Sequence, residues 1–224
     1  MGGGLQNVLV QGLSRRTLLG GGFATLLLTG VRSSHASSYL TLRIRAPHLE
    51  ARFRNWWNRT EGYAEDLVTS KHPSVVQFRH SLATIPSDLG LIDFIGAVNN
   101  VVNAAATYVE DYRSGPGRDQ WASPIEFLER GGDCEDFALT KAATLYSLGW
   151  PLDSTYLLVG ELDRPPAKPT GHAVLVAVLG NRQDSHLVLD NISDRVVSLQ
   201  RYQGFRPIYG LDRQGVTMFL PPLS

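Results

Sequence analysis

The stretch that decides the fold is Arg130-Gly131-Gly132-Asp133-Cys134-Glu135-Asp136-Phe137, which sets the only cysteine of the chain among glycines and carboxylates. Asp133 is a favourable N-cap residue, because its side chain can accept a hydrogen bond from a free backbone N–H of the first helical turn. Asp136 stands at the third position of that turn, as in a capping box. Apolar residues then recur at three- and four-residue spacing, which predicts a helix over residues 134–148.

Cys134 would be the first residue of this helix. The positive end of the helix dipole and the free N–H groups there favour the thiolate, the nucleophilic form of cysteine. Three neighbouring carboxylates, Asp133, Glu135 and Asp136, have the opposite effect, because like charges raise the pKa of a thiol. A reactive thiol at this position therefore requires a histidine partner or a bound cation.

The segment before the cysteine helix also carries clear signals. Ser123-Pro124-Ile125-Glu126 reads as a capping box with proline at the first helical position, and predicts a short helix that ends at Gly131-Gly132. Two adjacent glycines permit positive φ angles and a close approach of the backbone. This turn would deliver Cys134 to the start of its helix.

Length and composition indicate one globular domain over residues 37–224. The chain has 224 residues, of which 43% are hydrophobic, enough for a sizeable core. Lysine plus arginine equal aspartate plus glutamate at 21 each, so nothing indicates a nucleic-acid partner. A single cysteine forms no internal disulfide, and in an exported protein an unpaired thiol is expected to be buried or used.

Residues 1–36 are predicted to be an export signal. Ser14 to Leu19 begins a twin-arginine-like pattern, the apolar run 18–31 is shorter than the ~20 residues that span a bilayer, and Ser34-His35-Ala36 is a small-x-small cleavage site. Leu18 stands where the twin-arginine signal prefers phenylalanine, so the general secretory route also remains open. No cysteine stands directly after the apolar run, where a lipid anchor would be attached. The expected product is a periplasmic protein that is neither lipid-anchored nor embedded in the membrane.

Two longer helices are predicted before the cysteine helix. Residues 49–68 carry aromatic core candidates, and residues 91–112 follow the 3.6-residue period most closely. Asn99 and Asn103 lie one turn apart in the second of these helices. They either tie down a neighbouring loop or are solvated on the surface.

After Pro151 the pattern changes to strands. Short β-branched or leucine-rich runs separated by turn residues predict an antiparallel meander over residues 155–159, 172–179, 186–190 and 195–199. The proline-rich segment 164–171 is too irregular for a strand and could flank a substrate cleft. Helices followed by a sheet make an α+β domain, with the cysteine at a helix N-terminus packed on antiparallel strands.

His172 starts one predicted strand and Asp190 ends the next. If these strands pair, the two side chains can be neighbours, as a Cys-His-Asp triad requires: the histidine takes the thiol proton and the aspartate orients the histidine. His186 is an equally available histidine by residue type, and Asp190-Asn191 is a good turn pair. Only the combination with Cys134 favours a catalytic reading.

Four blocks of sequence carry a resemblance to a known family: Trp121 to Leu128, Gly132 to Ala138, Gly171 to Leu175 and Leu187 to Asn191. In order and spacing they resemble the bacterial transglutaminase-like cysteine peptidases, which include the LapG-type periplasmic proteases. The block around the cysteine is specific, and the matching blocks extend over about half of the predicted mature domain.

The resemblance implies a papain-like, transglutaminase-like fold in which Cys134 is the nucleophile, His172 the general base and acid, and Asp190 the residue that orients the histidine. It also implies a Ca²⁺ ion held by the carboxylates beside the nucleophile, which correspond to Asp133 and Glu135, with Asp136 as a third. A dication there would neutralise the carboxylates and fix the start of the helix.

For LapG-type enzymes the substrate is a large surface adhesin, cut near its N-terminus at a di-alanine site so that cells leave a biofilm, and an inner-membrane cyclic-di-GMP receptor sequesters the protease. For this chain, only the resemblance to that family implies an adhesin substrate and a cyclic-di-GMP receptor as partners. Arylamine N-acetyltransferases use a related triad, but an export signal argues against them. Transglutaminase activity would use the same catalytic residues and remains an alternative. A non-catalytic binding module, which would keep the fold without the chemistry, is another. One cysteine and scattered histidines lack the spacing of a zinc site.

Overall fold

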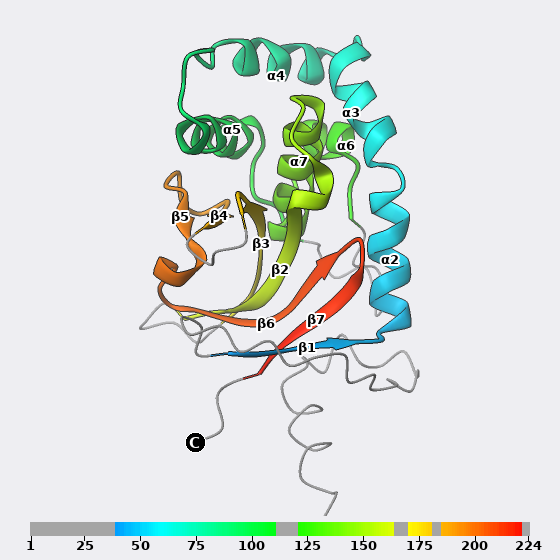
Figure 1. Ribbon diagram of the computed structural model, residues 1–224. Helices are drawn as coiled ribbons and strands as arrows, with labels where there is room; N and C mark the ends of the chain where they lie inside the picture. Colours follow the sequence, from blue (N-terminus) through cyan, green and yellow to red (C-terminus); the bar gives the residue numbers. More distant parts are fainter. Residues whose placement is uncertain (1–38, 111–120, 164–169, 181–184, 221–224) are drawn as a thin grey trace, which may run out of the picture.

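The computed structural model describes residues 39–110, 121–163, 170–180 and 185–220 (Figure 1). Within them, the helices precede most of the sheet, as the predicted α+β class requires. The α-helices are α2 (Pro47–Trp57), α3 (Thr60–Thr69), α4 (Pro73–Ala83), α5 (Leu91–Ala105), α6 (Pro124–Arg130) and α7 (Cys134–Ser147). The strands are β1 (Leu40–Ile44), β2 (Thr155–Leu162), β3 (Thr170–Val178), β4 (His186–Leu189), β5 (Val197–Ser198), β6 (Phe205–Asp212) and β7 (Gly215–Leu220).

The strands form one antiparallel sheet in the order β1-β7-β6-β2-β3-β4-β5. The predicted pairing of the strands at 172–179 and 186–190 is confirmed, with Leu175 opposite Leu189. The sheet is wider than the predicted meander because β1, β6 and β7 extend it on one side. β1 pairs with β7 across most of the chain's length, a contact that no local sequence pattern indicates.

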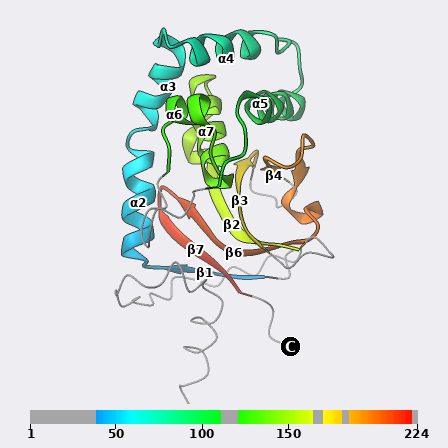
Figure 2. The same cartoon turned by 180° about the vertical axis from the view of Figure 1, so that it is seen from behind.

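Helix α7 lies at the centre of the molecule, in contact with α3, α5 and α6 on one side and with β2 and β3 on the other (Figures 1 and 2). Residues 136–145 of this helix are all buried. At its start, the rings of Phe127 and Phe137 meet edge to face with centroids 4.6 Å apart, which fixes α6 against α7. A helix buried almost all round is held by its neighbours and can present its first residue in one position.

The predicted helix over residues 49–68 is wrong in one respect, because it is two helices, α2 and α3. The break follows from local hydrogen bonding: the carbonyl of Trp56 accepts from the backbone N–H of Arg59 at 3.0 Å and from the hydroxyl of Thr60 at 3.3 Å. These bonds tighten the chain at the end of α2. Of the four aromatic residues expected in the core, Phe53, Trp56 and Trp57 are buried, whereas Tyr63 is half-buried.

Other boundaries differ as well. The helix predicted to reach Tyr112 ends at Ala105, because the following residues are extended and pair with the segment before Cys134. Residues 111 and 112 lie outside the described part of the chain. The predicted strand over residues 195–199 shortens to β5 and a 3₁₀ turn at Leu199–Arg201, and α4 was not predicted at all, since it buries only Val75 and Phe78.

A close approach of β2 and β6 shapes the sheet beside the start of β3. The register shifts between Val159 and Gly160, so that Gly160 faces Pro207, a residue that donates no backbone hydrogen bond. A Cβ atom at position 160 would meet the carbonyl oxygen of Arg206 and lie 2.7 Å from Cζ of Phe205. Only glycine leaves room for this packing, and Gly160 is also the residue opposite His172.

The predicted export signal, residues 1–36, and its cleavage site lie outside the described residues. Among the helices that the structure describes, none has the length and hydropathy to cross a membrane.

Candidate active site

Cys134 is the first residue of α7, and its position is fixed by a reciprocal cap. The carboxylate of Asp133 accepts from the backbone N–H of Glu135 at 3.1 Å and of Asp136, while the carboxylate of Asp136 accepts from the N–H of Asp133 at 3.3 Å. This is the capping box that the sequence predicted, and it is confirmed. Asp136 also accepts from the N–H of Ala122 at 2.8 Å, which ties the lead-in to α6 against the start of α7.

The two glycines before the cysteine are needed for a second contact. Gly131 has φ of +80°, and a Cβ atom there would meet the backbone of Thr107 and lie 2.9 Å from Val109. The carbonyl of Gly132 accepts from the N–H of Val109 at 2.9 Å, so the segment after α5 lies alongside the turn. The expectation that this turn needs glycine for close approach is therefore confirmed.

This pairing also brings Tyr108 to the site, which the sequence did not indicate because the residue was assigned to a helix. Tyr108 is 49% exposed. Partial burial, followed by electrostatic interactions with Cys134, Asp133, Glu110 and Glu135, raises the pKa of Tyr108 to about 12. Tyr108 therefore lies within electrostatic reach of Cys134.

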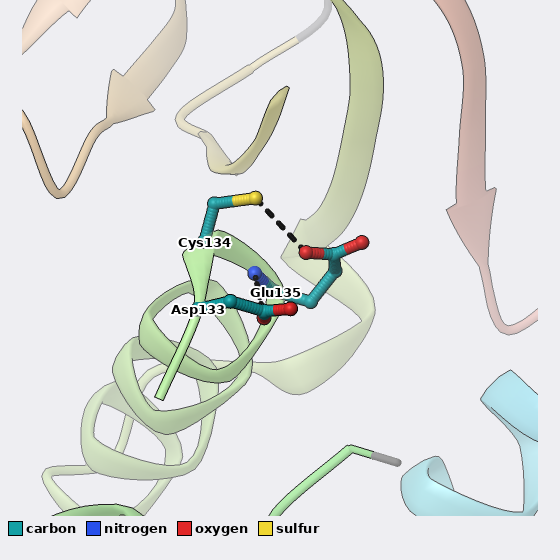
Figure 3. A group of neighbouring side chains, drawn as sticks. All are labelled: Asp133, Cys134 and Glu135. Atoms are coloured by element: carbon teal, nitrogen blue, oxygen red, sulfur yellow. Dashed lines mark hydrogen bonds between the residues drawn. The ribbon is translucent and has the colours of Figure 1, made fainter. Parts of the chain in front are cut away.

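The thiol of Cys134 is 8% exposed and donates a hydrogen bond to Oε2 of Glu135 at 2.9 Å (Figure 3). Burial raises the pKa of this thiol far above its usual range, and the charge and hydrogen bond of Glu135, then the charge of Asp133, raise it further. The backbone N–H of Ala173 donates to the sulfur and opposes the shift. The conflict predicted from sequence is thus present: the carboxylates hold the thiol in its protonated form.

His172 and Asp190 form a buried pair at the adjoining ends of β3 and β4. Nε2 of His172 lies 2.8 Å from Oδ1 of Asp190, and the two residues are 8% and 2% exposed. Burial alone would raise the pKa of Asp190, but hydrogen bonds from His172, Tyr202 and the N–H of Ile192, with the charge of His172, lower it overall. The expected proximity of the two side chains is confirmed.

Two aromatic residues that the sequence did not single out enclose this pair. The hydroxyl of Tyr202 donates to Oδ2 of Asp190 at 2.6 Å, and the ring of Phe205 packs edge-on against His172 with centroids 6.4 Å apart. The two rings also pack on each other, with centroids 5.1 Å apart. No motif marks them, because they follow β5 and reach the site only through the fold of the sheet.

His172 adjoins Ala173, whose N–H contacts the sulfur, so β3 brings the histidine to the end of α7. Between the described residues Cys134 and His172 no hydrogen bond is formed, because Glu135 takes the thiol hydrogen and Asp190 takes Nε2. The bond to Asp190 leaves Nδ1 of the imidazole as the remaining nitrogen.

Ligand atoms for a metal ion gather at the start of α7. One atom each from Asp133, Cys134 and Glu135 lies within 4.8 Å of the others, the only such group among the described residues (Figure 3). Asp136, the third expected carboxylate, is not in this group, since it is 3% exposed and accepts the backbone bonds of Ala122 and Asp133. The carboxylates of Asp133 and Glu135 are hard oxygen donors of the kind that Ca²⁺ prefers.

The fold resembles solved structures of LapG from Legionella pneumophila. The calcium-bound form aligns with 22% identity and a TM-score of 0.54, over 71% of this chain and 87% of that chain. The EGTA-treated form aligns with 22% identity and a TM-score of 0.55, over 71% and 84% respectively. At this identity the likeness shows the fold, which is the predicted transglutaminase-like one. No curated protein matches the chain.

The sequence itself matches the family described as bacterial transglutaminase-like cysteine proteinase BTLCP over residues 70–205. The match begins before α4 and ends at the start of β6, so it includes Cys134, His172 and Asp190. It covers more than half of the chain. The protein belongs to the family of bacterial transglutaminase-like cysteine proteinases and is a cysteine peptidase.

Proposed function

We propose that this peptidase is an exported, calcium-dependent endopeptidase in which Cys134 is the nucleophile, His172 the general base and acid, and Asp190 the residue that orients His172. The observation that carries the proposal is the buried bond of 2.8 Å between His172 and Asp190, next to a thiol at the first residue of α7. A buried carboxylate that binds one imidazole nitrogen fixes the tautomer and stabilises the imidazolium.

In this mechanism Nδ1 of His172 takes the thiol proton while Nε2–H stays bonded to Asp190. The sulfur of Cys134 then attacks the carbonyl carbon of the scissile peptide bond, and the imidazolium returns the proton to the leaving amide nitrogen as the carbon–nitrogen bond breaks. Water activated by the same imidazole hydrolyses the acyl-enzyme and regenerates the thiol. The positive end of α7 supports the developing thiolate.

We propose Asp133 and Glu135 as calcium ligands, with Asp136 as the cap that fixes their geometry. Two carboxylates supply part of the six to eight oxygen ligands of Ca²⁺, the rest being backbone carbonyls or water. A bound cation would offset the negative charge beside the sulfur. Since Glu135 is the present acceptor of the thiol hydrogen, a Glu135 engaged elsewhere leaves that hydrogen to His172.

The substrate is a protein, as the peptidase family implies. We propose that it is the N-terminal region of a large surface adhesin, that cleavage releases cells from a biofilm, and that an inner-membrane cyclic-di-GMP receptor holds the enzyme in check. The support is the resemblance of the cysteine, histidine and aspartate blocks to LapG-type proteases. Residues 1–36 as an export signal and the periplasm as the location belong to the same proposal.

The test is cleavage by the chain expressed with its own N-terminus and recovered from the periplasm. An N-terminal fragment of a candidate adhesin from the same genome is incubated with calcium or with EGTA, and Cys134→Ala serves as the inactive control. We expect cleavage that requires both calcium and the thiol, and an enzyme whose first residue by mass spectrometry lies near Ser37.

Three results would contradict parts of the proposal. Incorporation of a labelled amine without cleavage would indicate transglutaminase activity. Cleavage that is equal in calcium and EGTA would remove the metal from the mechanism. A thiol that does not react with iodoacetamide when calcium is present would favour a binding module that keeps only the fold.

A further inference from the structure

The loop after β4 carries Asp190, and α5 holds it by two asparagines. Nδ2 of Asn99 donates to the carbonyl of Ser193 at 2.9 Å. Nδ2 of Asn103 donates to the carbonyl of Asp190 at 2.9 Å and to that of Ser193 at 3.3 Å. Of the two alternatives that the sequence left open, the structure shows the loop contact and not surface solvation, and Asn99 is fully buried. Figures 1 and 2 both show α5 beside the β4 end of the sheet.

Lys141 of α7 is the other unusual group in this region. It lies seven residues after Cys134 and therefore on the same face of the helix, and it is fully buried. Its carbon stem lies near Phe137, with Nζ 5.9 Å from the ring centroid. Lysine is almost never buried completely without a partner, so a role for its amine is expected.

Lys141 and three buried asparagine side chains carry complementary hydrogen-bonding groups. Among the described residues, Nζ has no hydrogen-bond partner, and neither have the buried amide oxygens of Asn99, Asn103 and Asn191. Nζ supplies only donors and Oδ1 only acceptors. Lys141 lies on α7, and Asn99 and Asn103 lie on α5, which packs against α7. Buried polar groups of this kind are ordinarily paired directly or through an ordered water.

We propose that Lys141 is a positioning residue of the active site: its amine binds the amide oxygens of Asn99 and Asn103 and so holds the loop that orients Asp190 toward His172. The inference rests on the proposed roles of His172 and Asp190. Lys141 touches neither substrate nor the reacting atoms. It acts through two asparagines whose amide nitrogens donate hydrogen bonds to backbone carbonyls of the loop.

The electrostatics agree with this location. Burial lowers the pKa of Lys141 to about 7, and the negative charges of Asp190 and Asp194 oppose that shift. Both carboxylates therefore lie within electrostatic reach of Nζ. The amine keeps at least two N–H donors in either protonation state, so the positioning role does not depend on its charge.

The stability of a Lys141→Met variant provides a first check. Replacing a whole buried ion pair by apolar residues is often neutral or stabilising, but removing one hydrogen-bond partner leaves the buried amide oxygens unsatisfied. Lys141→Met should therefore lower the melting temperature, and its activity normalised to folded protein should still fall.

The experiment compares Lys141→Met, Lys141→Arg and Asn103→Ala with the wild type, all as the full chain recovered from the periplasm, with calcium present. Thr140→Val is the matched control, because Thr140 is the neighbouring buried residue whose hydroxyl has no partner among the described residues. The readouts are kcat and KM on the cleaved substrate, the rate of Cys134 alkylation by iodoacetamide, and proton exchange at Nε2–H of His172 by NMR. The last two need no substrate.

For Lys141→Met we expect kcat to fall about tenfold, the size of one buried hydrogen bond, with KM unchanged and exchange at Nε2–H faster. Lys141→Arg should restore most of the rate, since it keeps the donors. Adding Asn103→Ala to Lys141→Met should cost little more, because both act through the same loop.

A Lys141→Met variant with wild-type kcat, alkylation and exchange would overturn the inference, and so would equal losses in Thr140→Val. If Lys141→Met fails to fold, Lys141→Arg and Asn103→Ala still test the inference. Wild-type proton exchange at Nε2–H of His172 in Asn103→Ala would overturn it. If no substrate is ever cleaved while exchange and alkylation respond as expected, the proposed function fails and the positioning role stands.

Discussion

His172 and His186 lie on neighbouring strands of one sheet and differ in what they contact. His172 binds the carboxylate of Asp190 at 2.8 Å, and His186 lies 3.1 Å from the hydroxyl of Tyr156. A carboxylate fixes the imidazole and stabilises its protonated form, whereas a phenol supplies no charge. By residue type alone, either histidine could have been the one in the triad. Only the hydrogen-bond partner of each histidine distinguishes them.

The surroundings widen the difference. Asp190 receives three hydrogen bonds that, with the charge of His172, lower its pKa in spite of burial, so Asp190 keeps its negative charge at neutral pH. At His186 burial alone lowers the pKa of the imidazole, and the Tyr156 ring meets it edge-on. In the proposed mechanism His172 takes up and returns a proton, whereas His186 has no part in it.

The largest effect should come from exchanging each histidine for alanine. We expect His172→Ala to lower kcat by about 10⁴-fold or more, as loss of a general base does, and His186→Ala to change it by no more than about twofold. Initial rates of substrate cleavage, normalised to folded protein, provide the measurement. Equal losses in the two variants would mean that the catalytic role of His172 is wrong.

The partners provide a second test. Asp190→Asn should lower kcat by about 10³–10⁴-fold, because an amide can impose the wrong tautomer on His172 and cannot stabilise its cation. Tyr156→Phe, which removes the partner of His186, should leave kcat unchanged. Circular dichroism of both variants controls for folding, and an Asp190→Asn enzyme with wild-type kcat would refute the orienting role.

A smaller effect is expected for Tyr202, which donates to Oδ2 of Asp190 at 2.6 Å. A hydrogen bond to a charged group contributes about 1.5–3 kcal/mol, so Tyr202→Phe should lower kcat by about tenfold with KM unchanged. The variant keeps the ring that packs on Phe205. A change in KM alone would instead place Tyr202 in substrate binding.

The smallest effect concerns stability and pH. Because burial lowers the pKa of His186, the unfolded chain binds a proton below about pH 6.5 that the folded chain does not yet bind. This group therefore contributes stability above about pH 6.5 that is lost as the pH falls. In His186→Asn, which keeps a polar partner for Tyr156, urea unfolding should show a shallower loss between about pH 6.5 and 5, by at most about 1.4 kcal/mol per pH unit. An unchanged slope would count against the buried neutral histidine.

The same contrast shows what sequence could predict. The capping box, the glycine turn and the helix of Cys134 depend on residues within a few positions of one another, and local rules describe them well. The pairing of His172 with Asp190 followed from strand order alone, since antiparallel neighbours bring a start and an end together. These features are encoded over short distances.

What the sequence did not predict depends on long-range packing. Tyr202 and Phe205 reach the His172 pair only because β6 crosses the sheet to lie beside β2. Tyr108 was assigned to a helix by its apolar period, but tertiary pairing with Gly132 ends that helix early. Lys141 carried no signal, because a lysine in a helix is ordinarily expected on the surface.

Gly160 has a consequence for how this enzyme tolerates mutation. It contacts no substrate in the proposed mechanism, yet a side chain there would collide with the backbone of β6 and with the Phe205 ring that packs on His172. In a library of random variants selected for cleavage, position 160 should be as depleted of substitutions as the catalytic positions. A map of mutational tolerance would then mark a residue whose whole contribution is the space that it leaves empty.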